Sequence, residues 1–449
     1  MSKICDDYID FLSKCKTERK CVAYITKELE KNGFKNINDV KTLKSGDKVY
    51  INKMSKALVA LKIGTDDIEN GMNILGAHID SPRLDIKSNP LYEQDGLVYL
   101  NTHYYGGIKK YQWTAIPLSL EGVVFLKNGK SVEISIGDND DDPVFCITDI
   151  LPHLAYEQMK KTASEFIEAE LLDVLVGSPS IEYAKNKDNK KDTDTEKDIN
   201  KKNILKLLKT KYNIDEEDFL SSEIEVVPQG KARYSGFDKS MILGYGQDDR
   251  VCAYSSFRAF LDSKNTKRTS CLILSDKEEI GSYGATGMDS CLLDNAISDV
   301  VYLLGKKDTN IATRHTLSSS YMLSSDVNAA FDPLNPALYD KQNASKFAGG
   351  LVFNKYTGSR GKSGASDANP EFIALVRNRL DSDNIKYQFA ELGKVEAGGG
   401  GTIALYAARF GMQVIDAGVS VLSMHAPWEI VSSYDFEEAY KGYYSFLQI

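Results

Sequence analysis

Several short apolar runs in this chain are followed closely by histidine, aspartate or glutamate. His78 follows the run at 73–77, and His425 comes just after the run at 419–422. Such runs predict buried strands of an α/β sheet. The carboxyl ends of parallel strands share one edge of a sheet, where ligands gather. The runs predicted to form buried strands are 73–77, 241–244, 270–274, 300–304, 321–323 and 419–422.

The sequence between these runs predicts helices and one distinct insertion. Residues 17–31 and 249–261 have the apolar spacing of helices, and Thr17 is placed to cap the first of them. From about Leu91 the sequence becomes rich in residues that favour β-strands, in an alternating pattern, and Asn128-Gly129 predicts a hairpin. We therefore expect one α/β domain formed by residues 1–90 and 238–449, interrupted by a β-rich insertion at 91–237.

Composition narrows the class of protein. With 42% hydrophobic residues and a net charge of -9, the chain is globular and repels phosphate backbones, so nucleic acid is not an expected partner. Its seven cysteines include no CxxC pair, which favours reduced thiols over a disulfide framework. The absence of a signal sequence and of an apolar stretch of ~18 residues predicts a cytoplasmic protein that does not enter membranes.

The polar residues at the predicted strand ends have the chemistry of a metal site. Imidazole together with carboxylate suits zinc or its first-row neighbours, cobalt and manganese among them. A carboxylate shared by two ions places them ~3.5–4 Å apart. Glu278 precedes one of these residues and is a candidate general base. The five predicted ligands are His78, Asp248, Glu279, Asp326 and His425.

Five segments together resemble the aspartyl aminopeptidase family of metallopeptidases. They occur in the family's order, and the resemblance covers nearly the whole chain. It implies a three-layer α/β/α peptidase domain of the zinc-aminopeptidase type, with the insertion used in assembly. The segments are GAHIDSP at 76–82, GQDDRV at 246–251, DKEEIGS at 276–282, SSD at 324–326 and SMH at 423–425.

The resemblance also implies a role for each matching residue. The resemblance implies two divalent ions, with zinc as the expected metal. His78 and Asp326 would hold one ion, Glu279 and His425 the other, and Asp248 would bridge them. Glu278 would be the catalytic base. Asp80 would hydrogen-bond His78 and fix its orientation. His153, in LPHLA at 151–155 and at the start of a predicted helix, matches a histidine that reaches a neighbouring subunit's active site.

The implied activity is removal of amino-terminal Asp or Glu from peptides. Such a side chain needs a cation, for which Lys355 is the candidate. Two features depart from the eukaryotic pattern and match a bacterial branch instead: the residues after Asp326 and the region 356–368. Both leave open a broader substrate preference. The resemblance further implies a homo-oligomer built from dimers, commonly of twelve subunits.

Other functions remain open at this point. The same metal scaffold carries carboxypeptidases and N-acyl deacylases. A carboxypeptidase would need a basic clamp for the terminal carboxylate, whereas an aminopeptidase needs a free α-amine in its substrate. A catalytically silent scaffold assembly is the third alternative, although every predicted ligand and the base are present.

Overall fold

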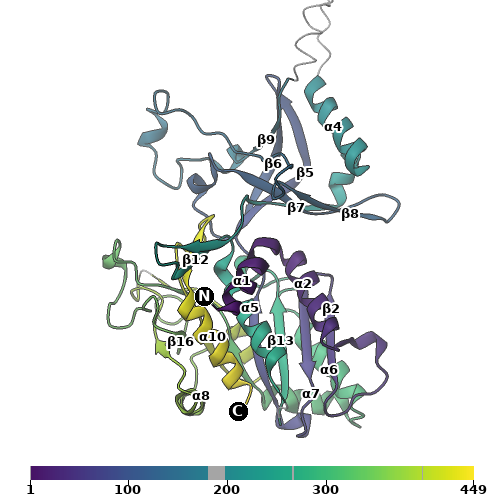
Figure 1. Cartoon of the computed structure of the whole chain (residues 1–449), viewed down its shortest axis with the longest axis vertical. Coiled ribbons are helices and arrows are strands. Elements are labelled where there is room, and N and C mark those ends of the chain that lie inside the picture. Colours follow the sequence, from purple (N-terminus) through teal and green to yellow (C-terminus); the bar gives the residue numbers. More distant parts are fainter. Residues whose placement is uncertain (1, 180–197, 265–266, 397) are drawn as a thin grey trace, which may run out of the picture. The chain divides into compact units, whose positions relative to one another are not determined.

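The computed structural model describes residues 2–179, 198–264, 267–396 and 398–449. These residues form two compact units, of which the first comprises Met1–Ser81 with Lys231–Ile449 and the second Pro82–Gly230. The expected boundary between residues 90 and 91 falls inside a single strand, β5 (Arg83–Gln94), so the second unit begins earlier in the sequence. Among the described residues, the first unit contains two sheets and the second contains one; Figure 1 shows the strands of both units.

A large mixed sheet forms the centre of the first unit. Its four middle strands, β13, β4, β14 and β18, run parallel to one another, so their carboxyl ends meet at one edge. Among the described residues the strands of this sheet, in spatial order, are β1 (Lys35–Asn36), β2 (Lys48–Lys53), β3 (Ala57–Lys62), β13 (Thr269–Ser275), β4 (Met72–His78), β14 (Tyr321–Ser324), β18 (Gln413–Gly418), β16 (Leu351–Asn354) and β17 (Tyr387–Phe389).

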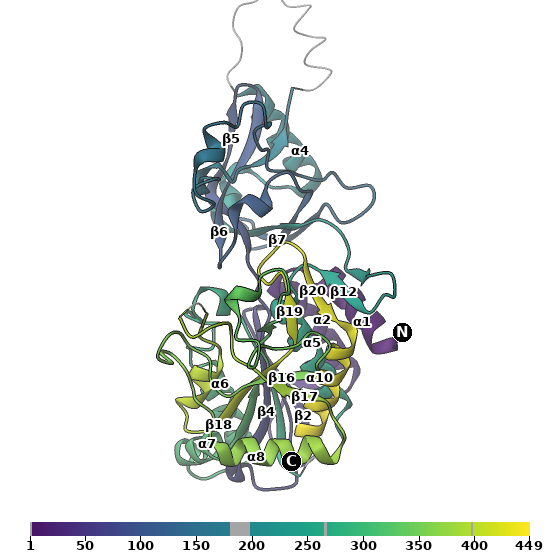
Figure 2. The same ribbon diagram turned by 90° about the vertical axis from the view of Figure 1, so that its left-hand side faces the viewer.

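Helices cover both faces of this sheet, as Figure 2 shows. Alternate residues of β4 point to opposite faces: Leu75 and Ala77 pack with one set of helices, and Met72 and Ile74 with the other. The layers are therefore α/β/α, as expected. The first set is α1 (Lys3–Lys14), α2 (Glu18–Lys31), α5 (Gln247–Asp262), α8 (Pro370–Ser382) and α10 (Ser433–Phe446); the second is α6 (Leu292–Leu303), α7 (Thr309–Ser318) and α9 (Ala404–Ala408).

A smaller sheet in the same unit carries two of the predicted ligand segments. Strand β20 lies between β12 and β19 and is antiparallel to both. In spatial order its strands are β11 (Arg233–Ser235), β12 (Met241–Gly244), β20 (Glu429–Ser432), β19 (Ser420–Leu422) and β15 (Asn328–Ala329).

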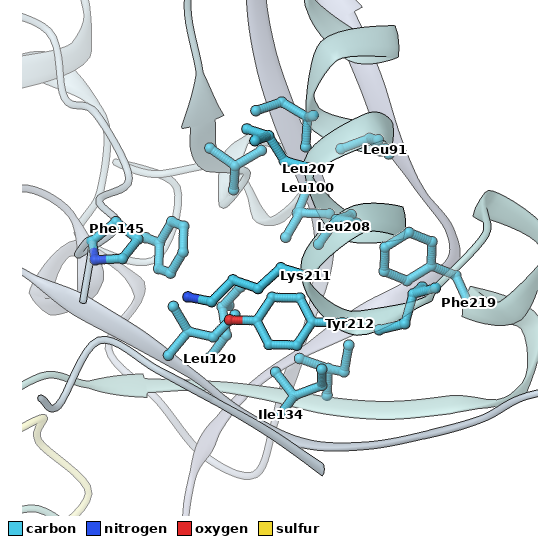
Figure 3. A pocket seen from close by; sticks show the side chains of 16 residues that line it. Leu91, Leu100, Leu120, Ile134, Phe145, Leu207, Leu208, Lys211, Tyr212 and Phe219 are labelled. Atoms are coloured by element: carbon cyan, nitrogen blue, oxygen red, sulfur yellow. The ribbon is translucent and has the colours of Figure 1, made fainter. Parts of the chain in front are cut away.

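The second unit is an antiparallel sheet covered by one described helix, α4 (Ile199–Tyr212). Between them lies an apolar cavity of about 250 Å³. Figure 3 shows Leu208 of the helix and Leu120 of the sheet among the apolar side chains that line this cavity. The strands, in spatial order, are β8 (Ser131–Ile136), β7 (Leu118–Phe125), β10 (Ser222–Pro228), β5, β6 (Leu97–Tyr105) and β9 (Val174–Gly177).

Several predicted elements can be compared directly. The helix at 17–31 is confirmed, and the Thr17 side chain caps it by accepting the Lys20 N–H. The hairpin at Asn128-Gly129 is confirmed as the β7–β8 connection. The strand predicted at 300–304 is wrong: these residues end helix α6, whose Ile297, Val300 and Val301 are buried. None of the described helices combines the length and apolarity that a membrane crossing requires.

Candidate metal centre

Three adjacent strands of the large sheet deliver three parts of the centre. His78 is the last residue of β4, Glu278 and Glu279 follow the end of β13, and Asp326 follows the end of β14. Strand β4 pairs in parallel with β13 on one side and β14 on the other. Because the strands are parallel and adjacent, their carboxyl ends deliver these side chains to the same edge.

The remaining two predicted ligands come from the smaller sheet. Asp248 follows β12 at the start of α5, and His425 lies in the loop between β19 and β20. The expectation that all five ligands belong to strands of one sheet is therefore wrong. The runs at 241–244 and 419–422 are strands, but antiparallel pairing with β20 places them in a second sheet.

The five side chains form two groups of potential metal donors that share Asp248. One group is His78, Asp248 and Asp326; the other is Asp248, Glu279 and His425, and the donor atoms of each lie within 4.8 Å of one another. His78 Nε2 lies 3.1 Å from Asp248 Oδ1, and His425 Nε2 lies 3.2 Å from Asp248 Oδ2. Each oxygen of this one carboxylate thus faces a different histidine.

Burial and mutual repulsion shift the pKa values of the carboxyl groups. Burial, reinforced by Asp248, raises the pKa of Glu279 well above its usual range. Burial, reinforced by Asp249, does the same to the pKa of Asp326. Burial also raises the pKa of Glu278 to about 7. Negative charge in this cluster is therefore poorly compensated by the protein's own groups.

Asp248 is the exception among the carboxyl groups. Burial would raise its pKa, but hydrogen bonds with His425 and His78 lower it below its usual range. Burial would lower the pKa of His425, yet Asp248 and Glu279 raise it to about 10. The two histidines therefore each form a hydrogen bond with Asp248, while the other carboxyl groups of the cluster lie close by.

This donor set fits zinc. Two imidazoles and three carboxylates are borderline-soft and hard ligands of the kind that zinc binds. Within the described part of the chain, Glu279 Oε1 is buried without a hydrogen-bond partner. A buried carboxylate oxygen left in this way is costly unless a cation or a donor meets it. Divalent cations at the two donor groups would supply the charge that these carboxylates lack.

Asp80 and Asp249 form hydrogen bonds that hold the donor residues in place. Asp80 Oδ1 lies 3.2 Å from His78 Nδ1, so the imidazole turns its other nitrogen toward Asp248. The two carboxylate oxygens of Asp80 also accept the backbone N–H groups of Glu278 and Glu279, each at 3.2 Å. Asp249 Oδ2 accepts the backbone N–H of His78 at 3.3 Å.

One residue at the centre was not predicted from the sequence. Glu429 begins β20, and its carboxylate accepts the backbone N–H groups of both Asp248 and His425. In the sequence, Glu429 lies four residues after His425 and looks like any charged residue near a turn, so nothing local marks it as part of the centre. Only the pairing of β20 with β12 and β19 identifies it as a neighbour of both ligands.

Glu278 differs from its neighbour Glu279 in exposure and surroundings. Its side chain is 17% exposed against 4% for Glu279, and its Oε2 lies 3.9 Å from His78 Nε2. Glu278 belongs to neither donor group. A carboxylate beside the donors, not among them, is free to exchange a proton with a reacting molecule.

The two predicted site residues that remain are Lys355 and His153. Lys355 is exposed directly after β16. The residues that come next in the chain, from Tyr356, line a hollow of about 420 Å³, and this lining includes Arg360, Lys362 and Lys394. His153 belongs to the second unit and is exposed in a turn closed by the Leu154 N–H and the Leu151 carbonyl. The α-helix predicted to start near His153 is therefore wrong.

Comparison with known proteins gives matches over the whole chain. The family described as aminopeptidase I zinc metalloprotease (M18) matches residues 11–447. A probable M18 family aminopeptidase 1 of Clostridium acetobutylicum is 54% identical, with 98% of this chain and 94% of the relative covered. The crystal structure of an M18 family aminopeptidase from Thermotoga maritima superposes with a TM-score of 0.93 at 42% identity, covering 99% of this chain and 95% of that one. A yeast mApe1 dodecamer shares the fold, with a TM-score of 0.78 at 21% identity, covering 99% and 96% of the two chains.

Proposed function

Because this chain belongs to the M18 family of zinc metallo-aminopeptidases, we propose that it hydrolyses the amino-terminal peptide bond with a pair of zinc ions. The observation that supports a pair most strongly is the shared carboxylate. Asp248 belongs to both donor groups, and its two oxygens face His78 and His425 separately. A carboxylate that bridges in this way is the usual core of a two-metal hydrolase.

Each donor group has an assigned ion in this proposal. His78 and Asp326 would hold one, Glu279 and His425 would hold the other, and Asp248 would be shared between them. Cobalt and manganese accept the same ligands and remain alternatives to zinc. When bound, such ions lower the pKa of a water toward ~7 and polarise the scissile carbonyl.

Glu278 performs the proton transfer. Its carboxylate takes a proton from the attacking water and returns it to the amine that leaves when the C–N bond breaks. Asp80 keeps this group in place because it holds the backbone N–H of Glu278. Asp80 also fixes the imidazole of His78, which is the usual role of a carboxylate behind a metal-binding histidine.

Exopeptidase action would follow from binding of the substrate's free amino terminus at the centre. A free α-amine can lie against a metal ion or a carboxylate, whereas an acylated terminus has neither the free lone pair nor the positive charge for either contact. Membership of an aminopeptidase family favours this assignment over a carboxypeptidase, an N-acyl deacylase or a silent scaffold. Peptides with free and acetylated amino termini test it, since only the free peptides should be cleaved.

The proposed substrates carry Asp or Glu at the amino terminus, with a broader range as the alternative. Lys355 is the proposed partner of the acidic side chain. The hollow lined by the residues after it contains Arg360 and Lys394 beside Glu391, while its Lys362 is ion-paired with Asp367. Among otherwise identical reporters, we expect those with terminal Asp or Glu to be cleaved faster than those with Leu or Ala. The measurement is kcat/KM for each reporter.

Substitution of Lys355 shows whether this residue acts in substrate specificity or affects the cleavage of all substrates. Lys355→Met should lower kcat/KM for the Asp reporter by ~10-fold or more, the size of a lost charged hydrogen bond, and leave that for Leu unchanged. Lys386→Met, at a residue preceding β17, is the matched control and should change neither value. Fastest cleavage of Leu by the unmodified enzyme would exclude the acidic preference.

We also propose that the active form is a homo-oligomer in which the second unit makes contacts between subunits. This unit exposes several large apolar side chains within one segment, a pattern typical of interaction surfaces. The dodecamer of a yeast relative with the same fold favours an assembly of several subunits over a monomer. The exposed side chains are Ile150, Leu151, Leu154, Tyr156 and Met159.

His153 lies within this exposed segment and would complete the active site of a neighbouring subunit by donating a hydrogen bond to the developing oxyanion. Mixing subunits tests this idea. His153→Ala and Glu278→Gln subunits should each be nearly inactive alone, and activity should partly return after they exchange. Recovery is expected because some mixed pairs combine an intact base with an intact histidine. Failure to recover, with exchange verified by differently tagged subunits, would show that His153 does not act across an interface.

A further inference from the structure

Glu429 occupies the junction between the two segments of the smaller sheet that carry metal donors. It is the first residue of β20 and is 1% exposed. Across the sheet it pairs with Gly244, the last residue of β12, from which the chain continues to Asp248. On its other side, β20 pairs with β19, from which the chain continues to His425. Glu429 therefore lies between two segments that are far apart in sequence.

The carboxylate of Glu429 binds the main chain of both residues. Its Oε2 accepts the N–H of Asp248 at 3.1 Å, and its Oε1 accepts the N–H of His425 at 2.7 Å. Both oxygens are thus directed at backbone donors, and Glu429 belongs to neither donor group. One buried side chain links the backbones of two residues whose own side chains approach to 3.2 Å.

The backbone of His425 needs such support. Its φ is +65°, in the left-handed region that residues other than glycine seldom adopt, and Ser423 in the same loop has a φ of +59°. Conformations of this kind persist only where the surroundings hold them. The hydrogen bond to Glu429 supplies one fixed point for His425, and the same carboxylate fixes the start of α5 at Asp248.

We infer that Glu429 is a positioning residue that sets the distance between Asp248 and His425 and thereby the affinity of the ion held with Glu279. This inference rests on the metal centre proposed above. Metal sites tolerate ligand distances only within about 0.2 Å of their preferred values. Glu429 holds two members of the Asp248–Glu279–His425 group, whereas it holds only one member, the shared Asp248, of the group that contains His78 and Asp326. Loss of its hydrogen bonds should therefore weaken the Asp248–Glu279–His425 group more.

Glu429→Gln is the direct test, because the amide keeps the size of the side chain but replaces one acceptor oxygen with a donor. That donor then faces a backbone N–H, so one of the two links is lost. We expect one of two zinc ions to bind ~10–100-fold more weakly, as for other groups that orient metal ligands. Zinc affinity is measured by competition with a chromogenic chelator, and excess zinc should restore most of the activity.

Asp435 provides a matched control in the same unit. It is a fully buried carboxylate on α10 that accepts two backbone N–H groups, those of Ala348 at 2.8 Å and Gly350 at 2.7 Å. Neither donor is a proposed ligand. Asp435→Asn should therefore lower the melting temperature while both zinc affinities stay at the unmodified value. Equal loss of zinc affinity in the two variants would mean that Glu429 acts only through general stability.

Glu429→Asp serves as a second variant if the glutamine variant does not fold. It keeps the charge but is one methylene too short to reach both N–H groups, so it should also weaken one ion. Unchanged affinity in either folded variant would overturn the inference. If the unmodified protein binds fewer than two zinc ions per chain, the proposed function is overturned instead, so the two failures are distinguishable.

Discussion

Glu278→Gln should lower kcat by ~10²–10⁴-fold, the usual size of a general-base contribution, while both zinc ions remain bound. The amide keeps the shape and polarity of the side chain but cannot accept the proton of the attacking water. Zinc should be retained because Glu278 lies outside both donor groups. The measurement is kcat at saturating zinc together with the zinc content of the purified variant.

The adjacent glutamate provides the control for this experiment. Glu279 is the less exposed of the two, and its carboxylate is a member of the group with Asp248 and His425. Glu279→Gln should therefore lose zinc affinity as well as activity, and excess zinc should recover part of the loss. Near-normal turnover of Glu278→Gln would place the base elsewhere, and zinc loss in that variant would make Glu278 a ligand.

Asp248→Ala should remove at least one zinc ion and abolish measurable activity. The substitution takes away the carboxylate that both donor groups share and leaves His78 and His425 without their common partner. We expect the affinity of the more weakly held ion to fall by more than ~100-fold, beyond the effect of residues that only orient ligands. Elemental analysis of the variant after dialysis is the measurement.

A buried carboxylate elsewhere in the same unit controls for lost stability. Asp416 of β18 is buried, and burial raises the pKa of its carboxyl group to about 6. It belongs to neither donor group, so Asp416→Asn should keep both ions. Retention of two ions by Asp248→Ala would rule out the bridging role.

The sequence predicted which side chains come together at the centre better than it predicted the architecture around them. Each of the five proposed ligands follows a short apolar run, and the chemistry of imidazole and carboxylate is visible without a structure. The assignment of Asp248 and His425 to a second sheet is not visible, because a short strand has the same composition in either sheet. The error at 300–304 has a related cause, since a short apolar run also suits the buried face of a helix such as α6.

Supporting residues were predictable only where they lie close in sequence to a ligand. Asp80 is two residues from His78 and was identified. Glu429 acts on Asp248 across 181 positions through a hydrogen bond that depends on strand pairing. No local pattern encodes that contact, and the same holds for the bond from the His78 backbone to Asp249. Tertiary pairing, not composition, determines which carboxylates stand behind the ligands.

A zinc titration of the unmodified protein decides whether two zinc ions share Asp248. Protein stripped with a chelator is titrated with zinc while bound metal and cleavage of an unblocked peptide are followed together. We expect two equivalents to bind per chain, with full activity only as the second is bound. Saturation of both binding and activity at one equivalent would show that the centre works with a single ion.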